Sequence, residues 1–288
     1  MRQEAKGPSL KNKKINNPVP SRGLFFKIDM SKVIADHKVI SIEVPADGNY
    51  ILRLKSPVEI PTIKPGNFAE ILIENSQDVF LRRPFSILDV NYEERWISFY
   101  VKVIGKGTQQ LGKVKEADTV NLIYPLGNSF SLPENNGKVL IVAGGSGIAP
   151  FILLGKELRK KNIKATYLIG GKSKKDILLI DEFSKYGEVL VTTEDGSLGE
   201  KGFVTNQSIF QSPDFNFDKI YSCGPEPMMK AVAKIASDRE IECEVSLENM
   251  MACGFGICLC CVTPTQEGNK RVCWEGPVFN SNYLKWQI

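Results

Sequence analysis

The strongest constraint on this chain is a cysteine-rich segment close to its C-terminal end. Five of its seven cysteines lie within residues 253–273. Four of them follow the spacing C-x4-C-x2-C-x11-C: Cys253, Cys258, Cys261 and Cys273. The opening C-x4-C-x2-C interval is the plant-type ligand pattern of a [2Fe–2S] cluster. The spacing therefore predicts a one-electron centre, and the rest of the chain has to supply or accept its electrons.

Glycines support this interpretation of the cysteine segment. Gly254 and Gly256 lie inside the first interval, where residues without a side chain let backbone N–H groups approach a cluster. The later stretch KRVCWEGPVF predicts a strand and a turn that return Cys273 to the loop. Cys260 offers an alternative third ligand with the spacing C-x4-C-x1-C. We favour Cys261, because the x2 interval is the known one, and expect Cys260 to be a packing residue that faces away.

Other uses of these cysteines fit less well. Disulfides suit small secreted domains, and we see no apolar signal segment ahead of this chain. Structural zinc sites usually combine two C-x2-C pairs, and the sequence offers only one. Inert buried thiols are difficult to reconcile with five cysteines in so short a segment. A zinc-stapled interaction protein remains the alternative that is not an enzyme.

Composition frames the other expectations. The chain has 288 residues, 42% hydrophobic and 24% charged, which is typical of a soluble protein of two or three domains. Its net charge of +4 is too small to indicate nucleic-acid binding. The longest apolar stretch, residues 139–154, is broken by glycines, so we expect no membrane span. Residues 1–23 are basic and without periodicity, which predicts a flexible tail. We expect a reducing, cytoplasmic setting.

The chain contains a single histidine, His37. One histidine leaves no Ser–His or Cys–His pair for nucleophilic catalysis and no multi-histidine metal site. We expect His37 to lie on the surface, at the start of a strand. Hydride and electron transfer suit such a chain, because the cofactor carries the chemistry.

The pattern of apolar residues predicts three regions after the tail. Residues 24–133 contain short alternating runs separated by turns, which indicates an antiparallel β-barrel. Residues 134–240 alternate buried strands with helical segments, which indicates a doubly wound parallel sheet. Residues 241–288 form a small cluster-binding domain. The predicted fold is thus a β-barrel, an α/β sheet and an iron–sulfur domain in succession.

Two segments of the barrel region carry residues that suit a flavin. In the first, Arg83 is placed to neutralise a pyrophosphate, Phe85 to contact an isoalloxazine, and Ser86 to bond near its reactive edge, with Pro84 between them. The second segment lies about twenty residues further on and adds further candidates: Tyr100, Val101, Lys102, Gly107 and Thr108. Each segment alone fits an ordinary strand end or loop equally well.

Two turns of the α/β region suit a dinucleotide. The turn AGGSGIAP follows the first parallel strand, where a glycine-rich turn places phosphate on a helix N-terminus. Its candidate residues are Gly144, Gly145, Gly147 and Pro150. It departs from G-x-G-x-x-G because Pro150 replaces the third glycine, and a plain strand–helix connection is the alternative. Cys223, Gly224 and Pro225 close the last parallel strand at the same edge. Cys223 is either a residue near the flavin or a buried thiol.

The motifs together suggest a family. The order RRPFSI, GKGT, AGGSGIAP, CGPEPMM and the cysteine motif followed by EGPVF resembles the electron-transfer subunits of dihydroorotate dehydrogenase B, which are ferredoxin-reductase-like flavoproteins. The resemblance covers about residues 24–279. It implies FAD on the barrel, NAD in the α/β region and the cluster on the four cysteines. It also implies a partner, an FMN-bearing subunit that oxidises dihydroorotate in pyrimidine synthesis, in a heterotetramer with two copies of each chain.

The resemblance implies that electrons pass from the partner's FMN through the cluster to FAD, and then as a hydride to NAD+. Subunits of NAD(P)H–ferredoxin oxidoreductases, transhydrogenases and sulfhydrogenases share most of these motifs. Some of them lack the first cysteine, so Cys253 favours the dihydroorotate system. Three lysines after the second parallel strand, Lys172, Lys174 and Lys175, leave NADP open as the nucleotide.

Overall fold

A computed structural model describes residues 32–74, 76, 78–134 and 137–286 of the chain. The predicted basic tail of residues 1–23 and the first residues of the predicted barrel region, 24–31, lie outside this part. All described residues belong to one compact unit that spans residues 31–288. No helix within the described ranges is long and apolar enough to cross a membrane.

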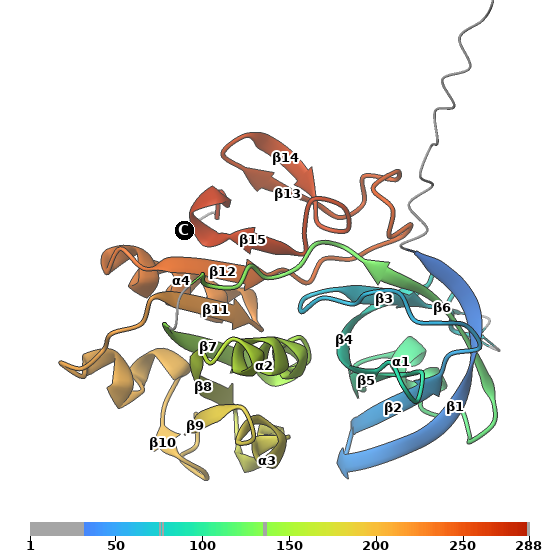
Figure 1. Ribbon diagram of the computed structural model, residues 1–288, viewed down its shortest axis with the longest axis horizontal. Coiled ribbons are helices and arrows are strands. Elements are labelled where there is room, and N and C mark those ends of the chain that lie inside the picture. The colour runs from blue at the N-terminus through green and yellow to red at the C-terminus, as the bar shows by residue number, and fades with distance from the viewer. Residues whose placement is uncertain (1–31, 75, 77, 135–136, 287–288) are drawn as a thin grey trace, which may run out of the picture. The chain divides into compact units, whose positions relative to one another are not determined.

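Six antiparallel strands close into a barrel in the order β1-β2-β5-β4-β3-β6 (Figure 1). Its elements are β1 (Val33–Ala46), β2 (Asn49–Lys55), β3 (Phe68–Ile71), β4 (Arg83–Asn91), β5 (Trp96–Lys102), α1 (Lys106–Leu111) and β6 (Thr119–Leu126). Successive side chains of a strand point to opposite faces. Leu52 and Leu54 of β2 and Phe99 of β5 are therefore completely buried inside the barrel. The predicted antiparallel barrel is confirmed.

His37 belongs to this barrel core, so its predicted place on the surface is wrong. It lies at an inward-facing position of β1 and is 0% exposed. Its Nε2 lies 3.2 Å from the hydroxyl of Tyr124, and its Nδ1 lies 3.0 Å from the carbonyl oxygen of Ala35. The Tyr124 hydroxyl also lies 3.1 Å from Ser56 Oγ. A small polar network is thus enclosed by apolar side chains, and burial lowers the pKa of His37.

The second region is a seven-stranded sheet in the order β10-β9-β8-β7-β11-β12-β15. Its strands are β7 (Lys138–Gly144), β8 (Lys164–Gly171), β9 (Gly187–Thr193), β10 (Glu200–Lys201), β11 (Lys219–Cys223), β12 (Glu242–Ser246) and β15 (Val278–Asn280). All neighbours pair in parallel except β12 and β15. The predicted doubly wound parallel sheet is confirmed.

Helices cover both faces of this sheet. They are α2 (Phe151–Lys160), α3 (Ile180–Phe183) and α4 (Glu226–Asp238), with 3-10 turns η1 (Gly145–Ile148), η2 (Lys174–Asp176), η3 (Val204–Asn206) and η4 (Ser208–Gln211). α2 and α3 pack on the face that holds Ile141 and Tyr167, whereas α4 packs on the face that holds Val142 and Val245. α3 is a single turn, and Leu179 directly before it is left-handed, with φ 61°.

The C-terminal region combines sheet strands with a separate hairpin. The hairpin consists of β13 (Val262–Thr265) and β14 (Gly268–Arg271), and η5 (Ser281–Tyr283) follows β15. The sheet extends beyond residue 240, because β12 and β15 join it. One apolar core runs from α4 to Val272 and Cys273 and on to Phe68 and Leu126 on the outer face of the barrel. The cysteine-rich segment is thus packed between the other two regions.

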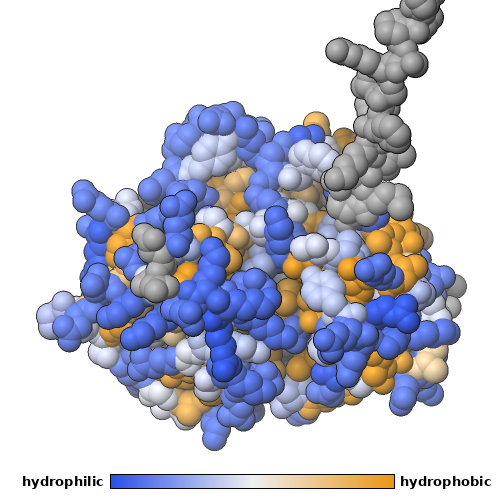
Figure 2. All heavy atoms as spheres, in the orientation of Figure 1, coloured by the Kyte–Doolittle hydropathy of each residue, from blue (hydrophilic) through white to orange (hydrophobic). Residues whose placement is uncertain are grey.

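The surface carries both polar and apolar groups. Figure 2 shows that hydrophilic side chains dominate one face of the molecule, with apolar patches at its right-hand side, over the barrel strands. Isolated apolar side chains at a protein surface are normal, and only their grouping beside a functional site is informative.

Candidate functional site

A cavity of about 280 Å³ lies at the carboxyl edge of the parallel sheet. Strands β7 and β11 end there side by side, with Ala143 paired to Cys223. The residues that line the cavity are Lys102, Gly144, Gly145, Ser146, Gly224, Pro225, Glu226, Met229, Leu247, Glu248 and Asn249. Ligands of doubly wound sheets bind at this edge, where the strand order reverses. The structure therefore brings both predicted dinucleotide turns together, beside Lys102 of the barrel.

Three other predicted dinucleotide residues lie behind the cavity wall. A Cβ atom at Gly147 would lie 2.2 Å from the carbonyl oxygen of Cys223, so glycine is required there for the close approach of two segments. Pro150 is buried at the start of α2. Cys223 is buried, and burial raises the pKa of its thiol far above the ordinary value. These three residues therefore support the wall of the cavity but do not line it.

The sequence did not identify Glu248 and Asn249 as part of this cavity. Both lie just after the carboxyl end of β12, beside the end of β11, and both line the cavity. Their position directly after a parallel strand was the one available signal. Lys102 also forms an ion pair with Asp176 across 3.7 Å, which links the barrel to η2 of the sheet region.

The two predicted flavin segments meet at one end of the barrel. A Cβ atom at Gly107 would lie 3.6 Å from Nε of Arg83, so the start of α1 faces the start of β4. The Arg83 Nη1 donates to the carbonyl oxygens of Leu81 and Arg82 at 3.0 and 3.2 Å. Thr108 Oγ1 accepts the backbone N–H of Ile104 at 3.0 Å, so this hydroxyl shapes the turn. The segments thus form one surface.

The remaining flavin candidates differ in how accessible they are. Pro84, Phe85 and Ser86 are half-buried on β4, which leaves part of each side chain open to a ligand. Tyr100 is buried and donates its hydroxyl hydrogen bond to Asn49 Oδ1 at 2.6 Å. Burial and the nearby Asp176 raise the pKa of Tyr100 to about 12. Val101 is fully buried in the barrel core, so only its backbone can face a ligand.

The four predicted cluster ligands are arranged as two pairs. The thiols of Cys253 and Cys258 interact electrostatically, and so do those of Cys261 and Cys273. Gly256 N–H donates to Cys273 Sγ at 3.1 Å and brings the first loop against the second pair. Each iron of a [2Fe–2S] cluster takes two protein ligands. The thiols and the N–H groups directed at them fit the ligand environment of a [2Fe–2S] cluster.

Backbone N–H groups surround these sulfur atoms. Phe255 and Ile257 each donate to Cys253 Sγ at 3.4 Å, and Cys273 N–H donates to Cys261 Sγ at 3.3 Å. Burial alone would raise the pKa of Cys253, but hydrogen bonds from the backbone of Cys258, Phe255 and Ile257 outweigh it and lower the pKa to about 6. Thiolate is the form that binds iron, and these N–H groups favour the thiolate of Cys253.

The structure also distinguishes the two adjacent cysteines. Cys261 is buried beside Cys273. Cys260 is exposed, and its thiol donates to the carbonyl oxygen of Met250 at 3.6 Å. The packing role expected for Cys260 is therefore wrong. The choice of Cys261 as the third ligand stays a prediction that this geometry favours.

The first turn of the cysteine loop rests on the barrel. A Cβ atom at Gly254 would lie 2.8 Å from Cγ of Glu70, so the loop passes directly over this side chain. Glu70 is fully buried, and neither of its carboxyl oxygens has a hydrogen-bond partner among the described residues. Burial raises the pKa of Glu70 to about 7. Glu70 lies opposite Pro84 in the β3–β4 pair. The cysteine loop therefore contacts the strand beside the predicted flavin motif.

The barrel, the dinucleotide cavity and the paired cysteines together define a class: a ferredoxin-reductase-like oxidoreductase with an iron–sulfur domain. Comparison with known proteins agrees. A family profile described as the iron–sulfur cluster binding domain of dihydroorotate dehydrogenase B matches residues 248–285. A second profile, the oxidoreductase NAD-binding domain, matches residues 141–234.

Curated relatives identify the family. A dihydroorotate dehydrogenase B (NAD(+)) electron transfer subunit from Desulforamulus reducens is 36% identical over 263 residues, which cover 90% of this chain and 100% of the relative. The subunit of the same name from Caldanaerobacter subterraneus is 41% identical over 219 residues, which cover 75% of this chain and 84% of the relative. The chain belongs to the family of dihydroorotate dehydrogenase B electron transfer subunits.

Solved structures share the fold. A chain from the structure of an NADH-dependent reduced ferredoxin-NADP oxidoreductase, studied for flavin-based electron bifurcation, superposes with a TM-score of 0.79. It is 31% identical, and the match covers 88% of this chain and 90% of that one. A ferredoxin NADP+ reductase from Neisseria gonorrhoeae with bound FAD and NADP is 18% identical with a TM-score of 0.58, which shows the fold alone.

Proposed function

We propose that this chain is the electron-transfer subunit of an NAD-linked dihydroorotate dehydrogenase B. It receives electrons from a partner subunit that oxidises dihydroorotate with FMN, and delivers them to NAD+. One observation carries the proposal: the cysteine loop rests on Glu70, which lies opposite Pro84 of the flavin motif. In this proposal the one-electron centre lies beside β3 and the hydride carrier beside the neighbouring strand β4.

When bound, the cluster supplies one-electron transfer, and FAD and NAD supply hydride transfer. In this proposal Cys253, Cys258, Cys261 and Cys273 hold the cluster. Their two pairs and the surrounding N–H groups support this role. Cys260, which is exposed, takes no part.

The flavin occupies the surface where β4 meets α1. Arg83 offers its charge to the pyrophosphate, with the backbone around Gly107 beside it. Phe85 and Ser86 are open enough to contact the ring system. Tyr100 and Val101 contribute by packing and through their backbone. Thr108 holds the turn in shape.

NAD occupies the cavity at the carboxyl edge of the sheet. The turn at Gly145 leaves room for the pyrophosphate, because a Cβ atom there would meet nothing within 4 Å. Gly144 and Gly224 allow close packing against Met228, whose side chain would lie 2.7 and 2.8 Å from their Cβ atoms. Glu248 and Asn249 offer polar groups to the nucleotide from the opposite wall. Lys102 reaches this cavity from the barrel and so connects the two nucleotide sites.

The partner binds at the cysteine loop. Ile257 is 81% exposed, Leu259 59% and Trp274 52%, and all three lie in or beside the segment of the four ligands. Apolar groups gathered at a functional site mark interaction surfaces. Electrons that enter through the cluster must cross this surface, so we infer that the FMN-bearing subunit covers it, in a heterotetramer with two copies of each chain. The seven free thiols suit a reducing compartment such as the cytoplasm.

A related function has support of its own. The match to the NADH-dependent reduced ferredoxin-NADP oxidoreductase covers most of both chains. In that alternative the partner exchanges electrons with ferredoxin and NADP. The partner therefore decides between the two functions, since both use the same cofactors on this chain.

Anaerobic affinity capture of the full-length chain from its native cells tests the proposal. We expect an FMN-containing partner to co-purify and the complex to reduce NAD+ when dihydroorotate is added. A partner that supports no dihydroorotate oxidation contradicts the proposed function and favours the ferredoxin alternative. Metal analysis of the same preparation tests the zinc alternative, since we expect about two irons per chain and no zinc.

A further inference from the structure

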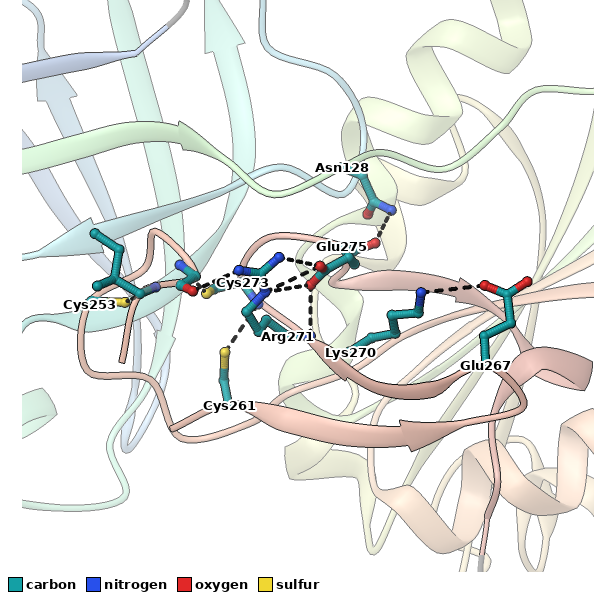
Figure 3. Close-up of polar contacts among 10 residues, drawn as sticks. Asn128, Cys253, Cys261, Glu267, Lys270, Arg271, Cys273 and Glu275 are labelled. Atoms are coloured by element: carbon teal, nitrogen blue, oxygen red, sulfur yellow. Dashed lines mark hydrogen bonds and ion pairs between the residues drawn. The ribbon is translucent and has the colours of Figure 1, made fainter. Parts of the chain in front are cut away.

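Both polar groups of the peptide unit between Gly256 and Ile257 form hydrogen bonds. Its N–H, on Ile257, donates to Cys253 Sγ at 3.4 Å. Its carbonyl oxygen, on Gly256, accepts a hydrogen bond from Arg271 Nη1 at 2.9 Å. The guanidinium of Arg271 is thus joined to a predicted cluster ligand through a single peptide group (Figure 3).

Gly256 makes this arrangement possible. Its φ is +74°, a conformation that favours glycine. A Cβ atom there would lie 3.0 Å from Cβ of Trp274 and 3.3 Å from Nη1 of Arg271. Gly256 N–H also donates to Cys273 Sγ at 3.1 Å. Two successive N–H groups at this glycine therefore point at sulfur atoms of different cysteine pairs.

Glu275 orients the guanidinium of Arg271. The Arg271 Nε lies 3.0 Å from Glu275 Oε2, and Arg271 N–H donates to the same oxygen at 2.8 Å. The Arg271 Nη2 also bonds the Glu275 carboxylate. This leaves Nη1 free to reach the loop. The backbone carbonyl of Glu275 accepts from Asn128 Nδ2 at 2.8 Å, which ties the pair to the segment after the barrel (Figure 3).

A salt bridge at the surface contributes little stability by itself. The neighbouring pair Lys270–Glu267 is of that kind: its atoms lie 3.4 Å apart, and the hydrogen bonds found for Lys270 do not reach the cysteine loop. Arg271 differs because it divides its donors between Glu275 and the loop. A guanidinium stays protonated at all ordinary pH values, so it presents a fixed positive charge to the carbonyl.

The positive charge of Arg271 determines the direction in which it shifts the reduction potential of the cluster. Reduction of the cluster adds one electron, and hydrogen bonds to the sulfur atoms help to set the potential. Hydrogen bonds in a chain polarise one another, so the bond from Arg271 strengthens the N–H that faces Cys253. Both the stronger N–H···S bond and the positive charge favour the reduced cluster.

We propose that Arg271 is a positioning residue that raises the reduction potential of the cluster through the Gly256–Ile257 peptide. The inference rests on the proposed function, which assigns a two-iron cluster to the four cysteines. It adds a residue that is not one of the four predicted ligands and whose bonds go to Glu275 and to the Gly256 carbonyl.

The test compares variants of the full-length chain, purified anaerobically, by iron content and by a redox titration followed with low-temperature EPR. For Arg271→Gln we expect normal iron content, a lower midpoint potential and shifted EPR g-values. Arg271→Lys keeps the charge but loses the simultaneous contact with Glu275 and the Gly256 carbonyl. The midpoint potential of its cluster should therefore lie between that of the wild type and that of Arg271→Gln. The matched control is Lys270→Gln, which removes a charge from the same hairpin and should leave the potential unchanged.

The outcomes distinguish a failure of the proposed function from a failure of this inference. Wild-type chain without a two-iron cluster overturns the proposed function. A loaded wild type whose potential and g-values are the same in Arg271→Gln overturns only the role of Arg271. If Arg271→Gln loses its iron, Arg271→Lys decides: a potential below the wild type supports the role, and an unchanged potential contradicts it. If Lys270→Gln shifts the midpoint potential as much as Arg271→Gln does, the effect comes from general surface charge, and the proposed role of Arg271 is contradicted.

Discussion

The barrel and the cysteine segment reach their structures by different means. The barrel encloses side chains such as Leu52, Ile97 and Phe99, which are completely removed from water and hold the strands together. In the segment of residues 253–261, most side chains are exposed or half-buried, and N–H···S hydrogen bonds set the backbone. Burial of apolar area stabilises the first region. The second region depends on its thiolates and on the metal that they bind.

The largest expected effect tests the dependence of the second region on its ligands. Cys258→Ser removes one of two thiolates from an iron, so we expect the cluster to be lost completely. Reduction of a dye by NADH through FAD should remain close to wild type, because the hydride path from NADH to FAD does not pass through the cluster. Iron content, visible absorbance and the dye assay measure this.

Cys260→Ser is the matched control, since Cys260 is exposed and lies one residue from the buried Cys261. It should keep full iron content. Loss of iron in this control would falsify the ligand set.

The next effect tests the packing of the nucleotide regions. Gly147→Ala places a Cβ 2.2 Å from the carbonyl oxygen of Cys223, which forces backbone apart at the carboxyl edge of the sheet. We expect a loss of about 3 kcal/mol in the free energy of unfolding, together with weaker NAD binding. Gly105→Ala is the control, because nothing lies within 4 Å of the position that its Cβ would take. Equal unfolding midpoints in urea for the two variants contradict the packing described here.

A smaller effect concerns the exposed side of the cysteine loop. Trp274→Ala should weaken binding of the partner subunit about tenfold, which corresponds to about 1.4 kcal/mol. Phe203→Ala provides a control of similar exposure, since Phe203 is 64% exposed and lies directly before η3 of the sheet region. Calorimetric titration with the partner measures both. If Phe203→Ala weakens binding and Trp274→Ala does not, the partner covers a different face.

The smallest effect concerns the polar network around His37 in the barrel core. Burial lowers the pKa of folded His37, whereas the unfolded chain has the ordinary value of about 6.5. Below pH 6.5 the unfolded state therefore binds more protons than the folded state, so stability falls as the pH falls. The loss grows to at most about 1.4 kcal/mol for each unit by which the pKa is lowered.

His37→Gln removes this titration, so its unfolding midpoint should change less than that of the wild type between pH 7.5 and pH 5.5. A variant with the same pH dependence as the wild type contradicts the buried neutral histidine.

The sequence predicted regions whose structure follows from periodicity. The alternation in β2 and β5 and the buried runs of β7 and β8 indicated the barrel and the sheet, because strands bury every second residue or both faces. The glycine turn at Gly144 and the cysteine spacing were found because their chemistry demands particular residues at fixed intervals.

Isolated polar residues escaped prediction. His37 and Glu70 each occupy a strand position whose burial depends on which distant segment covers it, and no local pattern carries that information. Arg271 and Glu275 have an i,i+4 spacing that is common on surfaces. Their contact with Gly256 arises only when the hairpin β13–β14 folds back on the loop. The three-residue strand β15 was equally hidden, because its place in the sheet depends on pairing with β12.

The central claim is that one chain joins the NAD site to the one-electron centre. The most direct test adds NADH to the anaerobically purified full-length chain and records flavin absorbance and low-temperature EPR together. We predict that the flavin bleaches and that the EPR signal of a reduced [2Fe–2S] cluster develops in the wild type but not in Cys258→Ser. A wild-type chain whose flavin bleaches while a chemically reducible cluster stays oxidised, at a potential that NADH can reach, contradicts the claim.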